Sequence, residues 1–213
     1  MLTKRGSTKN FFRKFWNLLW KDDSFKGWAF SIVFFFVFIK FLFFPFLSLV
    51  TGTVLPLAIV ESCSMHHKST LFSNFENWWE KHETKYNSLD LEQQDFEGGF
   101  LNKFRRGFTK GDILFIVGVK PEKIKIGDVI IFEANQQNPI IHRIIDIKEE
   151  NEELVFSTIG DNNNGQLNFE KEIGEEKIIG KAVFRLVPYI GWGKLIFFEH
   201  LKPPEEKGIC HEK

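Results

Sequence analysis

A run of 23 residues near the N-terminus constrains this chain more than any other feature. Trp28–Val50 carries a single charged side chain, Lys40. At about 1.5 Å per residue, a helix of this length crosses a hydrocarbon core of about 30 Å. The run is long for a cleaved signal peptide, and no small-residue cleavage pattern follows it directly. The sequence therefore predicts a retained transmembrane anchor over residues 27–50, with Pro45 kinking or ending the helix.

Residues 1–26 are basic, with seven lysines or arginines against two aspartates. Positive charge before the anchor predicts a cytoplasmic N-terminus and a single-pass protein of the cell membrane whose remainder is extracytoplasmic. Within this segment, Phe11–Trp20 alternates a basic face with an aromatic one. That pattern favours a helix lying in the membrane interface over one packed on a partner.

Composition excludes some functions and leaves others open. The formal net charge is zero, which argues against a nucleic-acid partner. Cys63 and Cys210 are too few to predict a disulfide framework or a metal site, and they leave the redox compartment undecided. His66 and His67 are adjacent, so on an extended chain they point to opposite faces and do not predict a metal site either.

The region after the anchor reads as an antiparallel β domain over residues 51–200, followed by a polar tail over 201–213. Short β-branched segments are separated by turn signals, and no helical segments alternate with them. Residues 66–110 interrupt this pattern as an insertion, with helical spacing at Phe72, Phe75, Trp78 and Trp79 and loop signals at 98–99 and 105–107. The expected strands are Thr53–Val60, Ile113–Val119, Val129–Glu133, Ile140–Lys148, Leu154–Ile159 and Ile178–Val187, and the apolar Pro188–Phe198 is expected to pack on the domain or enter the interface.

Strand pairing brings two candidate catalytic residues together. If the fourth and fifth expected strands form a hairpin closed near Asn151, His142 lies opposite Ile159 or Gly160. Asp161 then falls one or two positions beyond, within about 5–8 Å for opposite or diagonal neighbours. We therefore predict that Asp161 orients the His142 imidazole, as in the base–acid half of a catalytic triad.

Ser64 is the candidate nucleophile, because it follows the first expected strand at the entrance to the β domain. A serine hydroxyl needs a base to take its proton, and an imidazole, with an ordinary pKa of about 6.5, can do so and then protonate a leaving amine. The backbone N–H of Ser64 and the hydroxyl of Ser62, on the same side of an extended strand, are candidate oxyanion-hole donors. Cys63 is expected to point away from Ser64 and is not predicted to be a nucleophile.

These residues fall in four segments that resemble type I signal peptidases. Ser62–Met65 after an apolar anchor resembles the nucleophile box, and Gly127–Phe132 followed by His142-Arg143 resembles the next box. Gly160–Asn163 resembles the acidic box, and Gly180–Trp192 resembles the C-terminal segment. A histidine where bacterial members carry a lysine makes the chain similar to the archaeal and endoplasmic-reticulum branch.

The resemblance implies a mainly β, antiparallel barrel-like fold with an N-terminal transmembrane helix and an amphipathic helix before it. It also implies a membrane-bound serine endopeptidase that removes signal peptides from exported precursors by cutting after small residues, without a cofactor or metal. Ser64 maps to the nucleophile, His142 to the general base, Asp161 to the acidic partner and Ser62 to the oxyanion hole. The expected partners are precursor proteins and the lipid bilayer, with further membrane subunits left open and no nucleic acid.

The chain departs from the family pattern in ways that keep two alternatives open. About 45 residues separate Ser64 from Gly111, and the second acidic residue expected after Asp161 is absent, with only Asn168 and Glu170 in 165–170. One alternative is a self-cleaving β-fold peptidase with a Ser–Lys dyad, which would need a lysine near His142. The other is an anchored β domain that binds partners or signal sequences without cutting.

Overall fold

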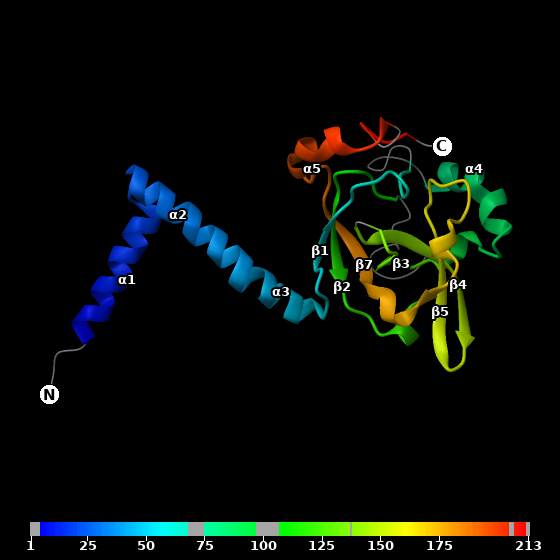
Figure 1. The fold of residues 1–213 in the computed structure, drawn as a ribbon, viewed down its shortest axis with the longest axis horizontal. Helices are drawn as coiled ribbons and strands as arrows, with labels where there is room; N and C mark the ends of the chain where they lie inside the picture. Colours follow the sequence, from blue (N-terminus) through cyan, green and yellow to red (C-terminus); the bar gives the residue numbers. More distant parts are fainter. Residues whose placement is uncertain (1–4, 68–74, 97–106, 137, 205–206, 212–213) are drawn as a thin grey trace. The chain divides into compact units, whose positions relative to one another are not determined.

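The computed structural model describes residues 5–67, 75–96, 107–136, 138–204 and 207–211, which form two compact units divided at Val50 and Thr51. Figure 1 shows an N-terminal pair of helices and a separate β domain. The expected helical residue Phe72 and the expected loop residues 98–99 and 105–106 lie outside the described residues. Each unit is described by itself.

The first unit contains one helix that is long and apolar enough to cross a membrane. It runs over 27 residues, Phe25–Thr51, with a mean hydropathy of 2.5 in its most apolar window. Pro45 does not end it, contrary to one of the expectations above. The helix passes from α2 (Phe25–Phe38) through a π-helical turn, η1 (Ile39–Phe43), into α3 (Phe44–Thr51). A wider turn directly before a proline accommodates the residue that lacks an N–H and clashes with the preceding turn.

A shorter helix, α1 (Arg5–Trp20), packs against α2. The Phe15 ring lies edge-on to the rings of Phe30 and Phe34, with centroids 5.8 and 5.3 Å apart. The Ser31 hydroxyl donates a hydrogen bond to the carbonyl of Leu19 at 2.9 Å. The aromatic face of α1 is therefore divided: one part covers the apolar helix, and the rest, including Phe11, Phe12 and Trp16, stays exposed.

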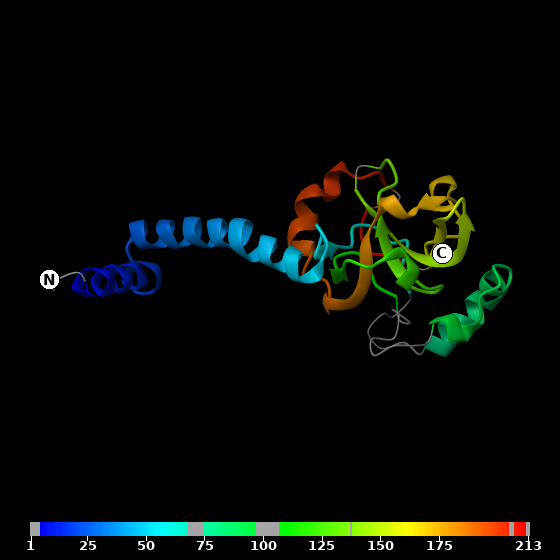
Figure 2. The same ribbon diagram turned by 90° about the horizontal axis from the view of Figure 1, so that it is seen from below.

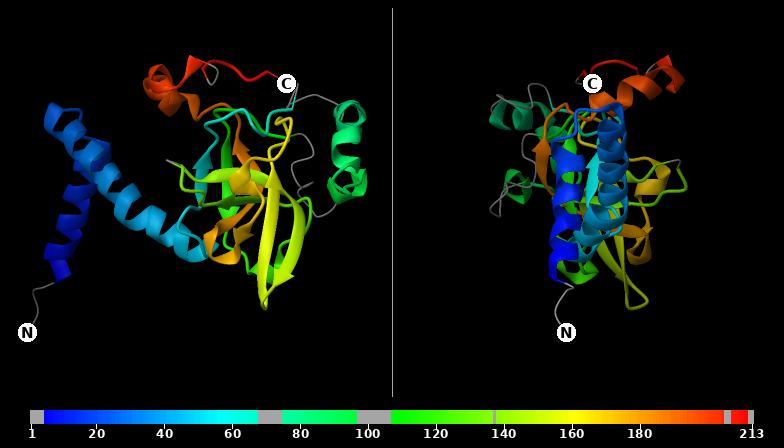
Figure 3. Two further views of the ribbon diagram at one scale, coloured as in Figure 1. Left: turned by 45° about the vertical axis from the view of Figure 1, so that its right-hand side comes forward. Right: turned by 90° about the vertical axis from the view of Figure 1, so that its left-hand side faces the viewer.

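The second unit is a curled, seven-stranded half-barrel whose described strands pair in antiparallel fashion, confirming the predicted fold class. The strand order is β1-β2-β7-β3-β4-β5-β6. Figures 2 and 3 show the sheet curling, with α4 and α5 on opposite sides of the domain. The strands are β1 (Leu57–Ile59), β2 (Ile113–Val117), β3 (Val129–Phe132), β4 (Ile140–Glu150), β5 (Glu153–Ile159), β6 (Ile173–Gly174) and β7 (Ile178–Val187).

Register follows from the turns that precede and join the strands. Asn151 and Glu152 both have positive φ, 54° and 69°, as a two-residue type I′ hairpin requires. At the far end of this hairpin Arg143 pairs with Ile159, which places His142 opposite Gly160, one of the two pairings predicted from the sequence. The two Gly-Asp pairs that introduce β2 and β3 are turns in which Gly111 and Gly127 adopt positive φ.

The half-barrel is filled by two apolar clusters, and a third joins it to a helix. One contains Leu114, Ile116 and Met65, and another contains Ile130, Phe132 and Phe156, all less than 2% exposed. The third holds α4 (Phe75–Asn87) against β4 and β5 through Trp78, Trp79 and Tyr86 packed with Ile145 and Ile159. The predicted helix in the insertion is thus present, and it covers the strands that carry the candidate site.

The C-terminal segment contains α5 (Trp192–Phe198), which packs on the domain mainly through Leu195, 1% exposed. The Trp192 indole donates to the Lys110 carbonyl at 3.0 Å. Ile196 and Phe197 on the same helix remain exposed. The expectation of packing on the domain is therefore confirmed for one face of this apolar segment.

Candidate active site

Ser64 lies on a segment that is held by backbone hydrogen bonds on two sides. On one side Val60 N–H donates to the Asp112 carbonyl at 2.9 Å, and Gly111 N–H donates to the Val60 carbonyl at 2.8 Å. On the other side Asn162 N–H donates to the Ser64 carbonyl at 2.7 Å. The Ser64 side chain itself is half-buried. The segment is thus fixed, while its serine hydroxyl keeps access to solvent.

The hydroxyls of Ser62 and Ser64 lie 3.1 Å apart, within hydrogen-bond distance. Either oxygen can be the donor. This contact agrees with the extended-chain argument that put both side chains on one side of the segment. An alcohol beside the nucleophile can donate to an oxyanion formed there, which is the role predicted for Ser62.

His142 lies on β4, is 4% exposed and pairs with an acid that the sequence did not single out. Its Nδ1 contacts the Glu170 carboxylate, which is fully buried in the short 3-10 turn Asn168–Glu170. The second Glu170 oxygen accepts the Leu167 N–H at 2.6 Å. In a neutral imidazole whose Nδ1–H donates to this carboxylate, Nε2 is left with its lone pair. An imidazole held in this tautomer is suited to act as a base.

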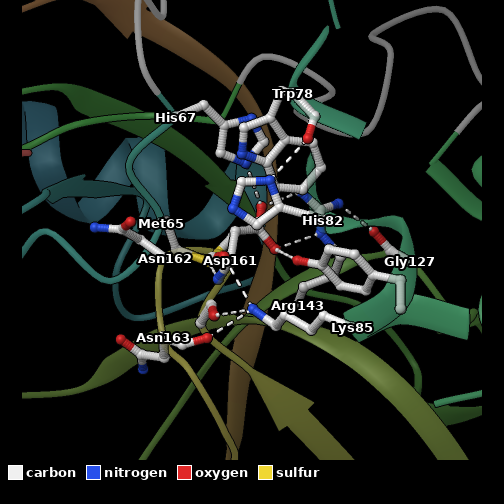
Figure 4. Close-up of polar contacts among 12 residues, drawn as sticks. Met65, His67, Trp78, His82, Lys85, Gly127, Arg143, Asp161, Asn162 and Asn163 are labelled. Atoms are coloured by element: carbon white, nitrogen blue, oxygen red, sulfur yellow. Dashed lines mark hydrogen bonds and ion pairs between the residues drawn. The ribbon is translucent and has the colours of Figure 1, made fainter. Parts of the chain in front are cut away.

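Asp161 does not contact His142, so the expected pairing of these two residues is corrected. Its carboxylate is fully buried and binds Arg143, with Nε–Oδ1 at 2.9 Å and Nη2–Oδ2 at 2.6 Å. His67 Nε2 lies 2.8 Å from Oδ2, and the Tyr86 hydroxyl donates to Oδ1 at 2.9 Å. Figure 4 shows His67 and Arg143 directed toward Asp161.

Alternation along β4 explains why Asp161 takes a different partner. Successive side chains on a strand point to opposite faces, so His142 and its neighbour Arg143 diverge. Asp161 lies on the face of Arg143, and Glu170 lies on the face of His142. The predicted register was right near His142, but register alone does not determine the face to which a residue beyond the strand end turns.

The electrostatics of the Asp161 cluster follow from burial and pairing. Burial alone would raise the pKa of Asp161, but the Arg143 guanidinium and further hydrogen bonds hold that pKa well below its usual range. Burial lowers the pKa of His67, more than its contact with Asp161 raises it, so this imidazole is neutral. Its Nδ1 has no hydrogen-bond partner within the described part of the chain, and Nε2–H therefore donates to Asp161.

No hydrogen bond joins Ser64 to His142 among the described residues, yet the two lie on neighbouring segments. A Cβ at Gly160 would meet the Ser64 carbonyl oxygen at 2.9 Å. Gly160 follows directly after Ile159, the residue that pairs with Arg143, and so lies opposite His142. Glycine thus permits the Ser64 main chain to approach the strand end next to the imidazole.

The two cysteines form a disulfide, which the sequence analysis did not predict. Cys63 and Cys210 are 147 residues apart in the sequence, and nothing in their spacing indicates pairing. The bond ties the C-terminal segment to the residue before Ser64 and removes the Cys63 thiol as a nucleophile. Asn162 Nδ2 supports the same junction by donating to the carbonyls of Cys63 and His211 at 3.0 and 2.9 Å.

The described residues contain no group of three or more His, Cys, Asp or Glu side chains arranged to hold a metal ion. His66 and His67 point to different partners: His66 Nδ1 lies 3.0 Å from the Thr109 hydroxyl, and His67 binds Asp161.

Reduction of the Cys63–Cys210 bond is expected to destabilise the β domain. Closing a loop of this length restricts the unfolded chain by about 4–5 kcal/mol in the chain-entropy model, which is an upper figure. Thermal unfolding of the purified chain should therefore shift down by several degrees in dithiothreitol. The Cys63→Ser/Cys210→Ser double variant should melt at the reduced temperature in either condition. An unchanged melting temperature after reduction proven by mass spectrometry would contradict this.

Asp161→Asn is expected to destabilise the fold in a pH-dependent way. It leaves the Arg143 guanidinium buried without a carboxylate, which costs about 3–5 kcal/mol. Since the folded pKa of Asp161 lies below its unfolded value of about 3.9, the stabilisation is present at neutral pH and is lost as the pH falls below about 4.

Denaturant unfolding at pH 7 and at pH 3 measures this difference. The difference in unfolding free energy between wild type and Asp161→Asn should be large at pH 7 and smaller at pH 3. Asp146→Asn is the control, because Asp146 is 45% exposed and pairs with exposed Lys148, a contact worth at most about 1 kcal/mol. Equal unfolding free energies for Asp161→Asn and wild type at pH 7 would refute the structural role.

Three relatives of this chain are named as catalytic subunits of the signal peptidase complex. No family model matches the chain. It is 30% identical over 106 residues to the human signal peptidase complex catalytic subunit SEC11C, covering 45% of this chain and 53% of the relative. It is 34% identical over 93 residues to SEC11 of Lachancea thermotolerans and 28% identical over 100 residues to SEC11 of Candida tropicalis.

These two fungal matches cover 40% and 44% of this chain, and 55% and 60% of the respective relatives. The chain thus spans somewhat more than half the length of the relatives it matches. The similarity agrees with the order of the four sequence boxes and with the half-barrel fold. Over 93 to 106 residues the chain is similar to proteins named as catalytic subunits of the signal peptidase complex, which confirms the resemblance predicted from the four sequence segments.

Proposed function

We propose that this chain is a membrane-bound serine endopeptidase that removes signal peptides from precursor proteins. The buried His142–Glu170 pair is the observation that carries the proposal. A histidine whose Nδ1–H is held by a carboxylate presents Nε2 as a base, and Ser64 lies on the adjoining segment. Homology to catalytic subunits supports the same activity.

The proposed reaction assigns one role to each side chain except His142, which serves first as a base, then as an acid and then again as a base. Ser64 Oγ gives its proton to His142 Nε2 and attacks the scissile carbonyl, and the oxyanion accepts hydrogen bonds from Ser64 N–H and the Ser62 hydroxyl. His142 then protonates the leaving amine, and a water molecule activated by the same imidazole hydrolyses the acyl-enzyme. Glu170 holds the imidazole, while Asp161 acts on the site through Arg143 and the surrounding loop.

The site of action we propose is the membrane of the endoplasmic reticulum, in place of the cell membrane expected from the sequence. The named relatives are subunits of a signal peptidase complex, so further membrane subunits are proposed partners. The basic residues before the candidate membrane helix predict a cytoplasmic N-terminus. A disulfide beside Ser64 suits an oxidising lumen on the other side.

Precursors cut after small residues in an Ala-x-Ala pattern are the proposed substrates, as the family resemblance implies. A non-catalytic membrane-anchored domain that binds signal sequences is the second candidate function. The lack of a direct Ser64–His142 hydrogen bond among the described residues is the observation that favours it. Catalytic hydrogen bonds are, however, often long without substrate and tighten only in the complex, so this geometry is compatible with catalysis.

Ser64→Ala is expected to abolish cleavage of a precursor with an Ala-x-Ala site while leaving membrane insertion intact. Loss of the nucleophile should lower the rate by more than about a thousandfold. Ser62→Ala should lower kcat by about 100- to 1000-fold, as for loss of one oxyanion donor. Mass spectrometry of products, with the full-length chain in membranes from expressing cells, measures both. Normal processing by Ser64→Ala would exclude this assignment, and inert wild type in membranes that contain its complex would favour the binding domain.

Glu170→Gln is expected to lower kcat by about 100- to 10,000-fold, because an amide cannot hold the imidazole in the tautomer needed for a base. The melting temperature is the second measurement in this experiment. The loss of activity in Glu170→Gln should persist at temperatures where the variant is fully folded. The matched control is Glu172→Gln, an exposed acid in the same region, which should behave as wild type. Full activity of Glu170→Gln would show that His142 needs no acidic partner.

A further inference from the structure

The loop that follows β5 holds the Ser64 segment from one side. In addition to the Ser64 carbonyl bond at 2.7 Å, Asn162 Nδ2 donates to the Cys63 carbonyl at 3.0 Å. The Asp161 N–H lies 3.4 Å from Met65 Sδ. Three consecutive residues, 63–65, are thus contacted by two consecutive residues of the loop. Any displacement of the loop is transmitted to the nucleophile.

The insertion helix α4 in turn holds this loop through one cation. Lys85 Nζ donates to the carbonyls of Gly160, Asp161 and Asn163 at 3.3, 3.0 and 2.8 Å. An ammonium group has three donors, and here all three are used on main-chain oxygens. Figure 4 shows Lys85 directed at the loop from the side opposite to Met65 and Asn162.

Lys85 projects from a part of α4 that is itself fixed. The neighbouring Tyr86 is fully buried and donates its hydroxyl to Asp161. The Trp78 ring stacks with the His67 ring and with the His82 ring, at centroid distances of 3.7 and 4.6 Å. His82 Nδ1 is also bonded to the Trp78 carbonyl at 2.7 Å. The helix therefore presents the ammonium from a rigid base, as a positioning group requires.

We propose that Lys85 is a positioning residue that holds the 160–163 loop against the Ser64 segment. The inference rests on the proposed peptidase function. Lys85 does not touch the reacting atoms and acts through Asn162. Three main-chain carbonyls turned toward one point repel each other, and the ammonium offsets this repulsion. Without it, the loop relaxes and the serine is displaced, and a displacement of about 1 Å at a reacting group can lower a rate by about 100-fold.

The helix that carries Lys85 belongs to the insertion, so the insertion takes part in positioning the Ser64 segment. The buried face of α4 packs on Ile145 of β4 and Ile159 of β5, next to His142 and Gly160. The half-barrel provides the nucleophile and the base. The insertion provides Lys85, which fixes the position of the nucleophile Ser64 relative to the base His142.

Lys85→Met is the first variant to test, because methionine keeps the length and apolar stem of lysine but loses the ammonium. In steady-state cleavage by the full-length chain in membranes, kcat should fall by about 10- to 100-fold with KM changed less than about threefold. Lys148→Met is the matched control, since Lys148 is 64% exposed and away from the loop, and it should match wild type. Wild-type kcat for a folded Lys85→Met chain would overturn the proposal.

A double-variant cycle with Asn162→Ala tests whether Lys85 acts through the loop. Asn162→Ala alone should also lower kcat, since it releases the Cys63 carbonyl. If both residues hold the same loop, the double variant should be little worse than the poorer single variant. Independent, multiplicative losses would show that Lys85 supports only general stability and would reject the positioning role.

Two outcomes need a separate comparison: a Lys85→Met variant that does not fold, and a wild-type chain that does not cleave. If Lys85→Met does not fold, Lys85→Arg replaces it in the cycle, because a planar guanidinium keeps the charge but cannot direct three N–H donors from a single nitrogen to the three carbonyls. It should lose kcat and show the same coupling to Asn162→Ala, and additive losses would again reject the proposal. If wild type itself does not cleave while it inserts and folds, the peptidase function fails first. Cleavage by wild type with unchanged Lys85 variants rejects the positioning role alone.

Discussion

The buried ion pair between Arg143 and Asp161 is the interaction on which the arrangement of the site depends. Two charges removed from water cost several kcal/mol each unless their hydrogen-bonding groups are satisfied. Here both Asp161 oxygens receive two donors each, and Arg143 also donates to the Gly127 carbonyl at 2.9 Å. Those donors come from β4, from α4, and from the segment that follows Ser64. The requirement to satisfy one carboxylate therefore brings separate parts of the chain to one place.

Two adjacent residues on β4 have different roles and lie on opposite faces of the strand. Arg143 has a structural role, and His142 is the candidate base. Arg143 is held in the ion pair. Asp161 stays ionised at neutral pH, because its pKa is held well below the usual range. His142, one residue earlier, turns to Glu170 and keeps one nitrogen for chemistry. The separation prevents the guanidinium from competing with His142 for its carboxylate. Two acids are needed because one carboxylate cannot face both sides of a strand.

Much of the fold could be predicted from local signals, whereas partners distant in sequence could not. Turn residues and β-branched runs predicted β7 at its observed bounds and the register beside His142. The sequence analysis gave Glu170 no role and noted it only where a second acidic residue was expected and absent, since its contact with His142 depends on a 3-10 turn rather than on strand pairing. The Cys63–Cys210 bond has no spacing signal at all. Two-residue β6 is too short to show a period, so it was missed.

The insertion is compatible with the half-barrel because it leaves and rejoins the domain at one point. Phe108 N–H donates to the Met65 carbonyl at 3.2 Å, so the two ends of the excursion are hydrogen-bonded to each other. Gly107, with φ of 59°, allows the returning chain to pass the His67 ring, where a Cβ would come within 2.5 Å. The entropic cost of closing a loop rises only slowly with its length. A long excursion can therefore be added here without changing strand register, and its helix can return to cover the buried Asp161 carboxylate.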